Sequence, residues 1–183
     1  LKKISQNKKI PLNLEMAANL SILRIVLRNK PNFVCIVPEK RKEITTEGGL
    51  NLKKNFKQIS RIVKILNKNS IRTSLFINPT IKDVKISKDL NVNCIELHTG
   101  RLSNLIKKKR KFKNELTKIK NSSKYADKIG LEVHAGHGMD YKTTKILSKI
   151  SEIKEFNIGH FIIGESIFDG LKSVIKKIRK KLK

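Results

Sequence analysis

One stretch, Phe33-Val34-Cys35-Ile36-Val37, decides the fold. It has no polar residue at alternate positions, so both faces of this expected strand are covered, as in a parallel sheet between helices. Other short apolar stretches alternate along the chain with longer, amphipathic, lysine-rich segments, which is typical of βα units. The expected strands are Leu12–Met16, Phe33–Val37, Thr73–Ile77, Asn93–Leu97, Leu131–His134 and Phe156–Ile158.

Amphipathic segments between these strands predict helices, and the segment from Arg101 to Lys128 is long enough to hold an additional short helix. The α/β pattern fits either a (β/α)8 TIM-type barrel or a doubly wound sheet. No GxGxxG motif or Walker lysine loop follows an early strand, which disfavours the nucleotide-binding open sheets. The expected helices are Ala18–Arg28, Leu52–Asn67, Ile81–Leu90, Leu105–Lys128, Lys142–Ile150 and Ile167–Leu182.

The length of the chain favours an incomplete barrel. A complete barrel has eight βα units and typically about 250 residues, whereas this chain has 183 residues and begins at Leu1 with a lysine-rich stretch that resembles the end of a helix. We therefore expect a single, partial TIM-barrel domain over residues 1–183 that lacks the first two βα units.

Composition argues against several functional classes. The net charge of +27 would suit a nucleic acid or an anionic membrane. The excess lysine is dispersed, however, aromatic residues are only 5% and no base-stacking motif is present, so we expect no nucleic-acid partner. No apolar run approaches the roughly 20 residues that span a bilayer, and no signal core is found. We expect no membrane partner and a cytoplasmic location, where Cys35 and Cys94 are reduced core thiols.

Carboxylates and histidines lie at the expected strand ends, where barrels place catalytic groups. Glu15 and Glu96 are embedded in apolar strands, and burial would raise the pKa of such carboxyl groups toward neutrality. Each could instead face solvent or form a structural ion pair. The segment His134-Ala135-Gly136-His137-Gly138 places a histidine between glycines that allow close approach of a ligand. A metal site is disfavoured, because the two histidines are three residues apart on a glycine turn without a nearby cysteine.

A second glycine turn, Gly159-His160, precedes a helix, and amides at a helix N-terminus bind phosphate. The loops after the last two strands are the usual phosphate site of these barrels. Gly138 and Gly159 with His160 fall in those loops, which predicts a phosphorylated small-molecule ligand.

Together these stretches resemble the pyridoxine 5′-phosphate synthase family. The matching motifs run collinearly over the chain: NLEMA (13–17), VPEKRKEITTEGGL (37–50), SLFI (74–77), IELHTG (95–100), HAGHG (134–138) and NIGHFIIG (157–164). The resemblance implies an eight-stranded barrel that condenses 1-deoxy-D-xylulose 5-phosphate with 3-amino-2-oxopropyl phosphate and releases phosphate and water. It also implies that no metal or organic cofactor is required and that the protein forms a homo-oligomer.

The resemblance also implies roles for individual residues. Glu15 matches an acid/base that shuttles protons, Glu96 a carboxylate that stabilises charged intermediates, and His137 a proton donor. The matching substrate-binding residues are Thr45 for the deoxyxylulose phosphate and Gly138, Gly159 and His160 for the aminooxopropyl phosphate.

The family's first two strands, which carry another base and phosphate contacts, have no counterpart before Leu1. We therefore expect these 183 residues to be poorly active alone. An inactive barrel remnant and a basic nucleic-acid-binding protein remain the alternatives.

Overall fold

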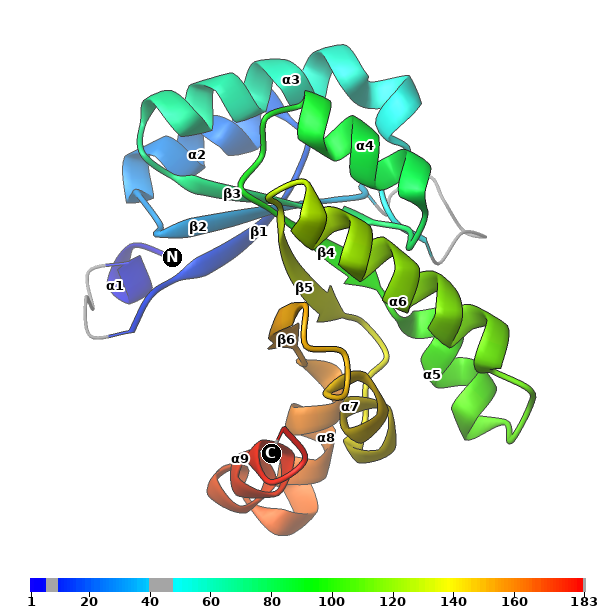
Figure 1. Ribbon diagram of the computed structural model, residues 1–183. Helices are drawn as coiled ribbons and strands as arrows, with labels where there is room; N and C mark the ends of the chain where they lie inside the picture. The colour runs from blue at the N-terminus through cyan, green and yellow to red at the C-terminus, as the bar shows by residue number, and fades with distance from the viewer. Residues whose placement is uncertain (6–9, 40–47, 183) are drawn as a thin grey trace. The chain divides into compact units, whose positions relative to one another are not determined.

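The structure, a computed structural model, describes residues 1–5, 10–39 and 48–182 (Figure 1). The chain forms two compact units. The first comprises Leu1–Asn78 with Lys82–Glu96, and the second comprises Pro79–Ile81 with Leu97–Lys183. The expectation of one domain over residues 1–183 stays a prediction.

Successive βα units supply a sheet whose strand order, within the described residues, follows the chain. β1 pairs with β2, β2 with β3, and β5 with β6, in each case parallel. This confirms the expected α/β fold, and the apolar stretch at residues 33–37 forms the expected strand. The strands are β1 (Asn13–Ala17), β2 (Phe33–Val37), β3 (Arg72–Ile77), β4 (Cys94–His98), β5 (Glu132–Gly136) and β6 (Ile153–Asn157).

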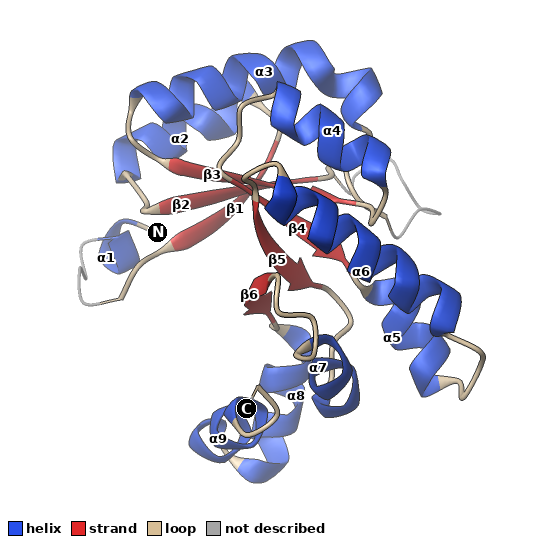
Figure 2. Ribbon diagram, viewed as in Figure 1, coloured by secondary structure: helices blue, strands red, loops and turns tan. Residues whose placement is uncertain are grey.

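In the first unit, α2 and α3 cover one face of strands β1 to β3 (Figure 2). α3 packs on β3, and its fully buried residues Ile59, Ile62 and Leu66 recur every three or four positions, as one helical stripe requires. Asn51 caps this helix by accepting the N–H of Lys54 at 3.1 Å. The helices of this unit are α1 (Lys2–Ser5), α2 (Leu20–Asn29) and α3 (Leu52–Lys68), with α4 (Ile81–Asp89) starting at its boundary.

In the second unit, two helices replace the long one that the sequence predicts between β4 and β5. α5 is the additional short helix expected there, and an ion pair between Arg101 and Glu115, 3.6 Å from Nε to Oε2, links it to α6. α6 packs on β5. The helices of this unit are α5 (Gly100–Lys107), α6 (Lys113–Lys128), α7 (Tyr141–Leu147), α8 (His160–Asp169) and α9 (Leu171–Arg179).

The prediction of a single C-terminal helix over Ile167–Leu182 is wrong. The structure has α8 and α9, separated at Gly170, whose φ of 75° a helix does not allow. Among the described residues, no helix combines the length and the apolar character that a membrane crossing needs.

Candidate active site

A layer of polar side chains crosses the strands of the first unit. In the parallel register Glu15 of β1 pairs with Cys35 of β2, and Cys35 pairs with Ser74 of β3. Residues in register on neighbouring strands point to the same face of a sheet. The Cys35 thiol also donates to the carboxylate of Glu96 on β4, with 3.5 Å between Sγ and Oε2. Two candidate catalytic carboxylates therefore flank one buried thiol.

Burial raises the pKa of Cys35 well above its ordinary value, and the negative charge of Glu96 adds to this effect. The hydrogen bond with Ser74 acts in the opposite direction, while the charge of Glu15 raises the pKa of Cys35 further. The thiol therefore stays protonated at neutral pH and can donate its hydrogen to Glu96.

Glu15 and Glu96 differ in their exposure. Glu96 is 4% exposed, as expected for a carboxylate embedded in an apolar strand. Glu15 is exposed, so of the alternatives left open for this residue the structure shows the one in which it faces solvent. Among the described residues, β1 stands first in the strand order and pairs with β2.

A strained turn carries His137 in the second unit. β5 ends at Gly136, and both His137 and Gly138 adopt left-handed backbone conformations, with φ of 76° and 72°. This region suits glycine but costs other residues about 1 kcal/mol or more. A Cβ added to Gly138 would also lie 3.2 Å from Cα of Gly100. The turn presents the His137 side chain at the surface.

Three residues at the end of β4 and the start of α5 contact this turn. The N–H of Thr99 donates to the carbonyl of Gly136 at 2.9 Å, and its hydroxyl lies 2.8 Å from the carbonyl oxygens of both Gly136 and His137. The ring of His98 stacks on that of His137, with 4.9 Å between centroids and 29° between planes. A Cβ on Gly100 would lie 2.8 Å from Cδ2 of His137, so the glycine leaves room for the ring.

The sequence motif IELHTG contains His98, Thr99 and Gly100, but the sequence predicted no specific role for these three residues. The available signal was their position in IELHTG, directly after a buried strand. Their importance comes from contacts with a segment 37 and 38 residues away, which periodicity does not reveal.

The other histidine of the HAGHG motif has different surroundings. His134 is buried and lies 2.8 Å from Glu132, measured from Nε2 to Oε1, whereas His137 is exposed. The two histidines of the motif therefore lie in different environments. Within the described residues, no group of three or more His, Cys, Asp or Glu side chains is arranged to hold a metal.

The predicted phosphate turn lies where β6 leads into α8. Gly159 occupies the N-cap position of α8, without a side-chain hydrogen bond to the helix, and both Gly159 and His160 are exposed. A Cβ added to Gly159 would meet no atom within 4 Å. The first amides of α8 thus have no capping side chain and are suited to an anion.

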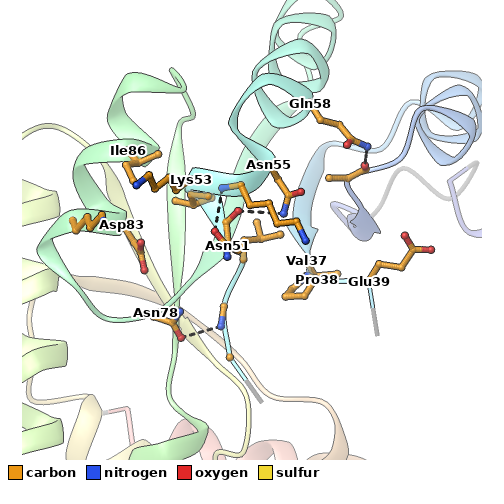
Figure 3. A pocket seen from close by; sticks show the side chains of 17 residues that line it. Val37, Pro38, Glu39, Asn51, Lys53, Asn55, Gln58, Asn78, Asp83 and Ile86 are labelled. Atoms are coloured by element: carbon orange, nitrogen blue, oxygen red, sulfur yellow. Dashed lines mark hydrogen bonds between the residues drawn. The ribbon is translucent and has the colours of Figure 1, made fainter. Parts of the chain in front are cut away.

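Figure 3 shows a cavity of about 710 Å³ in the first unit, lined by the end of β2, the start of α3 and residues of α4. The side-chain oxygen of Asn78 accepts the N–H of Gly49 at 3.0 Å on its wall. A Cβ on Gly49 would lie 2.3 Å from the carbonyl carbon of Ile77, so only glycine fits there. Lys53 and Lys82 add positive charge to the lining. The predicted contact residue Thr45 lies outside the described residues.

Comparison with known proteins decides the family. The family described as pyridoxal phosphate biosynthesis protein PdxJ matches residues 1–183.

The chain belongs to this family.

Curated PdxJ relatives are similar over most of the chain. Pyridoxine 5′-phosphate synthase of Pelagibacter ubique is 64% identical over 173 residues, which cover 94% of this chain and 72% of that protein. The enzyme of the same name from Zymomonas mobilis is 45% identical over 170 residues, covering 93% of this chain and 66% of the relative. The resemblance to the pyridoxine 5′-phosphate synthase family is thereby confirmed, and the chain is an enzyme of vitamin B6 biosynthesis.

Solved structures with low sequence identity share the fold. The 3-keto-L-gulonate-6-phosphate decarboxylase of Vibrio cholerae matches with a TM-score of 0.66 and 13% identity, over 99% of this chain and 76% of that one. The tryptophan synthase A-subunit of Pyrococcus furiosus matches with a TM-score of 0.63 and 15% identity, over 99% and 69%. These TIM-barrel neighbours support the α/β architecture and nothing beyond it.

The expected loss of N-terminal strands has a different outcome. The PdxJ match extends over residues 1–183. The expectation that the family's first part is missing is therefore not borne out, and the poor activity inferred from it loses its basis.

Proposed function

We propose that this protein condenses 1-deoxy-D-xylulose 5-phosphate with 3-amino-2-oxopropyl phosphate to form pyridoxine 5′-phosphate, inorganic phosphate and water. The observation that carries the proposal is the 64% identity with a pyridoxine 5′-phosphate synthase. A ring closure of this kind needs several proton transfers, and the motifs shared with the family contain titratable groups suited to them.

Glu15, Glu96 and His137 are the proposed catalytic residues. Glu15 shuttles protons during imine formation and dehydration, and its exposure leaves the carboxylate accessible to a substrate. Glu96 stabilises positively charged intermediates, which agrees with a buried carboxylate because charge interactions are stronger away from water. His137 is the proposed proton donor, and its exposure on the turn leaves the imidazole accessible to a substrate.

Phosphate recognition is proposed for the two glycine turns. Gly138 is held in a left-handed conformation beside His137, and Gly159 opens α8 with uncapped amides, next to His160. These groups would hold the aminooxopropyl phosphate, and Thr45 would contact the deoxyxylulose phosphate. Holding both substrates together supplies the proximity that a two-substrate condensation needs.

The test is a direct assay of the purified protein with both substrates. We expect equal amounts of pyridoxine 5′-phosphate and inorganic phosphate, measured by chromatography and a phosphate assay. Glu15→Gln should lower turnover by roughly 10²-fold or more, because it removes a proton acceptor. Lys64→Gln on the exposed side of α3 is the control and should retain parental turnover.

A folded protein that forms no product, whichever of the two substrates is added first, would refute the proposal. Two further results would point to the alternatives. Nucleic-acid binding that weakens steeply with salt and is unaffected by Glu15→Gln would favour a basic binding module. Neither turnover nor binding would favour an inactive remnant.

The finer architecture, the location and the assembly are part of the same proposal. We propose that the βα units belong to an eight-stranded barrel, because the chain covers 76% of a barrel-type neighbour at a TM-score of 0.66. A cytoplasmic location agrees with Cys35 and Cys94 being buried thiols rather than a disulfide. We further propose that the protein forms a homo-oligomer and binds neither nucleic acid nor membranes. Light scattering after size-exclusion chromatography tests the assembly, and a monomer at micromolar concentration would contradict it.

A further inference from the structure

His137 adopts a left-handed backbone conformation that histidine does not favour. Two consecutive left-handed residues form the turn, and the first of them is a histidine. A residue persists in such a conformation only where its surroundings hold it there. The position of the imidazole therefore depends on contacts from outside the turn, and these come from the last residue of β4 and the two residues after it.

Thr99 makes the main contacts. It occupies the N-cap position of α5, where a threonine hydroxyl normally accepts an N–H of the first helical turn. Thr99 makes no such bond. Its hydroxyl instead lies 2.8 Å from the carbonyl oxygens of Gly136 and His137, and the residue is fully buried. The Thr99 side chain therefore does not cap α5 and instead bonds to the turn.

The residues on either side of Thr99 act on the ring itself. His98 is 6% exposed and stacks against His137, with 4.9 Å between ring centroids. Gly100 has no side chain, and an added Cβ would lie 2.8 Å from Cδ2 of His137 and 3.0 Å from Cε1 of His98. One face of the imidazole is thus supported by a ring, and the space beside it is kept open.

From this geometry we propose that the segment His98-Thr99-Gly100 is a positioning element that fixes the His137 imidazole in its reactive orientation. The hydroxyl of Thr99 is its principal contact. The inference rests on the proposed function, because it assigns His137 the role of proton donor. Thr99 touches no reacting atom in this proposal and acts through His137.

The decisive comparison is between two substitutions of Thr99 in the full-chain protein. Thr99→Val keeps the shape of the side chain and removes the hydroxyl, whereas Thr99→Ser retains it. We expect Thr99→Val to lower kcat by roughly 10- to 100-fold with KM within about twofold, because a misplaced catalytic group costs rate rather than binding. Thr99→Ser should recover most of that loss.

Thr73→Val is the matched control. Thr73 is also fully buried, and its hydroxyl also donates to a backbone carbonyl, that of Ile71 at 3.2 Å. It lies on β3, in the other unit. This variant should retain parental kcat, which would separate the loss of any buried hydroxyl from the loss of this one.

A second variant approaches the ring from another side. Gly100→Ala adds the Cβ that would lie 2.8 Å from Cδ2 of His137. Gly100 is the first residue of α5, and alanine is favoured over glycine in helices. A lower kcat without loss of thermal stability is the expected result, and it decides the inference if Thr99→Val does not fold.

Imidazole NMR signals report the ring position without any assay. The chain has four histidines, so the His137 signal can be assigned by its loss in His137→Asn. We expect Thr99→Val to shift the His137 and His98 ring signals, and Thr99→Ser and Thr73→Val to leave them in place. Unshifted signals together with parental kcat in both Thr99→Val and Gly100→Ala would overturn the inference. If the parent protein made no product, the proposed function would fail, and the NMR result alone would decide whether the segment positions the ring.

Discussion

The carboxylates of the first unit and the imidazole of the second are held in place by different means. Glu15 and Glu96 lie on regular strands. The register of β1 and β2 places Glu15 beside Cys35, and the Cys35 thiol donates to Glu96. His137 lies on an irregular turn held by a few polar contacts from Thr99. Register is distributed over many backbone hydrogen bonds, so single substitutions should disturb the imidazole more readily than the carboxylates.

The largest effect is expected for His137→Asn. Asparagine tolerates the left-handed conformation, so the turn should persist while the proton donor is lost. Turnover should fall by roughly 10²- to 10⁴-fold. The free energy of unfolding, measured with urea, should stay within about 0.5 kcal/mol of the parent value. A large loss of stability would mean that the imidazole holds the turn rather than the reverse.

Glu96→Gln should come next, with a fall in turnover of about 10²-fold from the loss of one preorganised charge. The same change removes a charge that raises the pKa of Cys35. The thiol should therefore react faster with iodoacetamide at pH values near 9, an expectation that follows from the greater thiolate fraction. Mass spectrometry of the alkylated peptide measures this rate, and an unchanged rate would show that burial alone keeps the thiol inert.

Gly138→Ala should destabilise the protein by about 1–2 kcal/mol, because alanine is strained at a φ of 72°. Gly164→Ala is the matched control. Gly164 lies within α8, and a Cβ there would meet nothing within 4 Å. The control should be neutral or slightly stabilising in urea unfolding. Equal stability of the two variants would contradict the strain assigned to the turn.

The smallest effect concerns the pH dependence of stability. Burial raises the pKa of the Cys35 thiol above its unfolded value, so the unfolded chain loses this proton first as pH rises. The free energy of unfolding should therefore fall above about pH 8.5. Cys35→Val keeps a buried apolar side chain and should remove part of that fall, by at most about 1.4 kcal/mol per pH unit. Urea unfolding at pH values of about 7 and 9.5 measures this fall in the free energy of unfolding. An identical fall in parent and variant would exclude Cys35 as the cause.

Local patterns predicted the secondary structure well where they were unbroken. The apolar run Phe33–Val37 is a strand with the expected bounds. The pattern failed where glycine or polar residues interrupt it. β6 begins at Ile153, three residues before the predicted start at Phe156. The prediction missed these residues because Lys154 and Glu155 are polar and exposed and so lack the apolar pattern of a buried strand. Gly170 divides the expected C-terminal helix, since its backbone conformation depends on more than side-chain periodicity.

The sequence by itself determined the alternation of strands and helices, the family motifs and the identity of the candidate residues, because these depend on neighbours along the chain. Only the tertiary structure decided that Glu96 is buried and Glu15 exposed, that Cys35 donates to a carboxylate 61 residues away, and that Thr99 holds a turn 38 residues away. Burial and hydrogen bonding are properties of pairs brought together by folding, and no periodicity along one segment specifies the partner of a side chain on another.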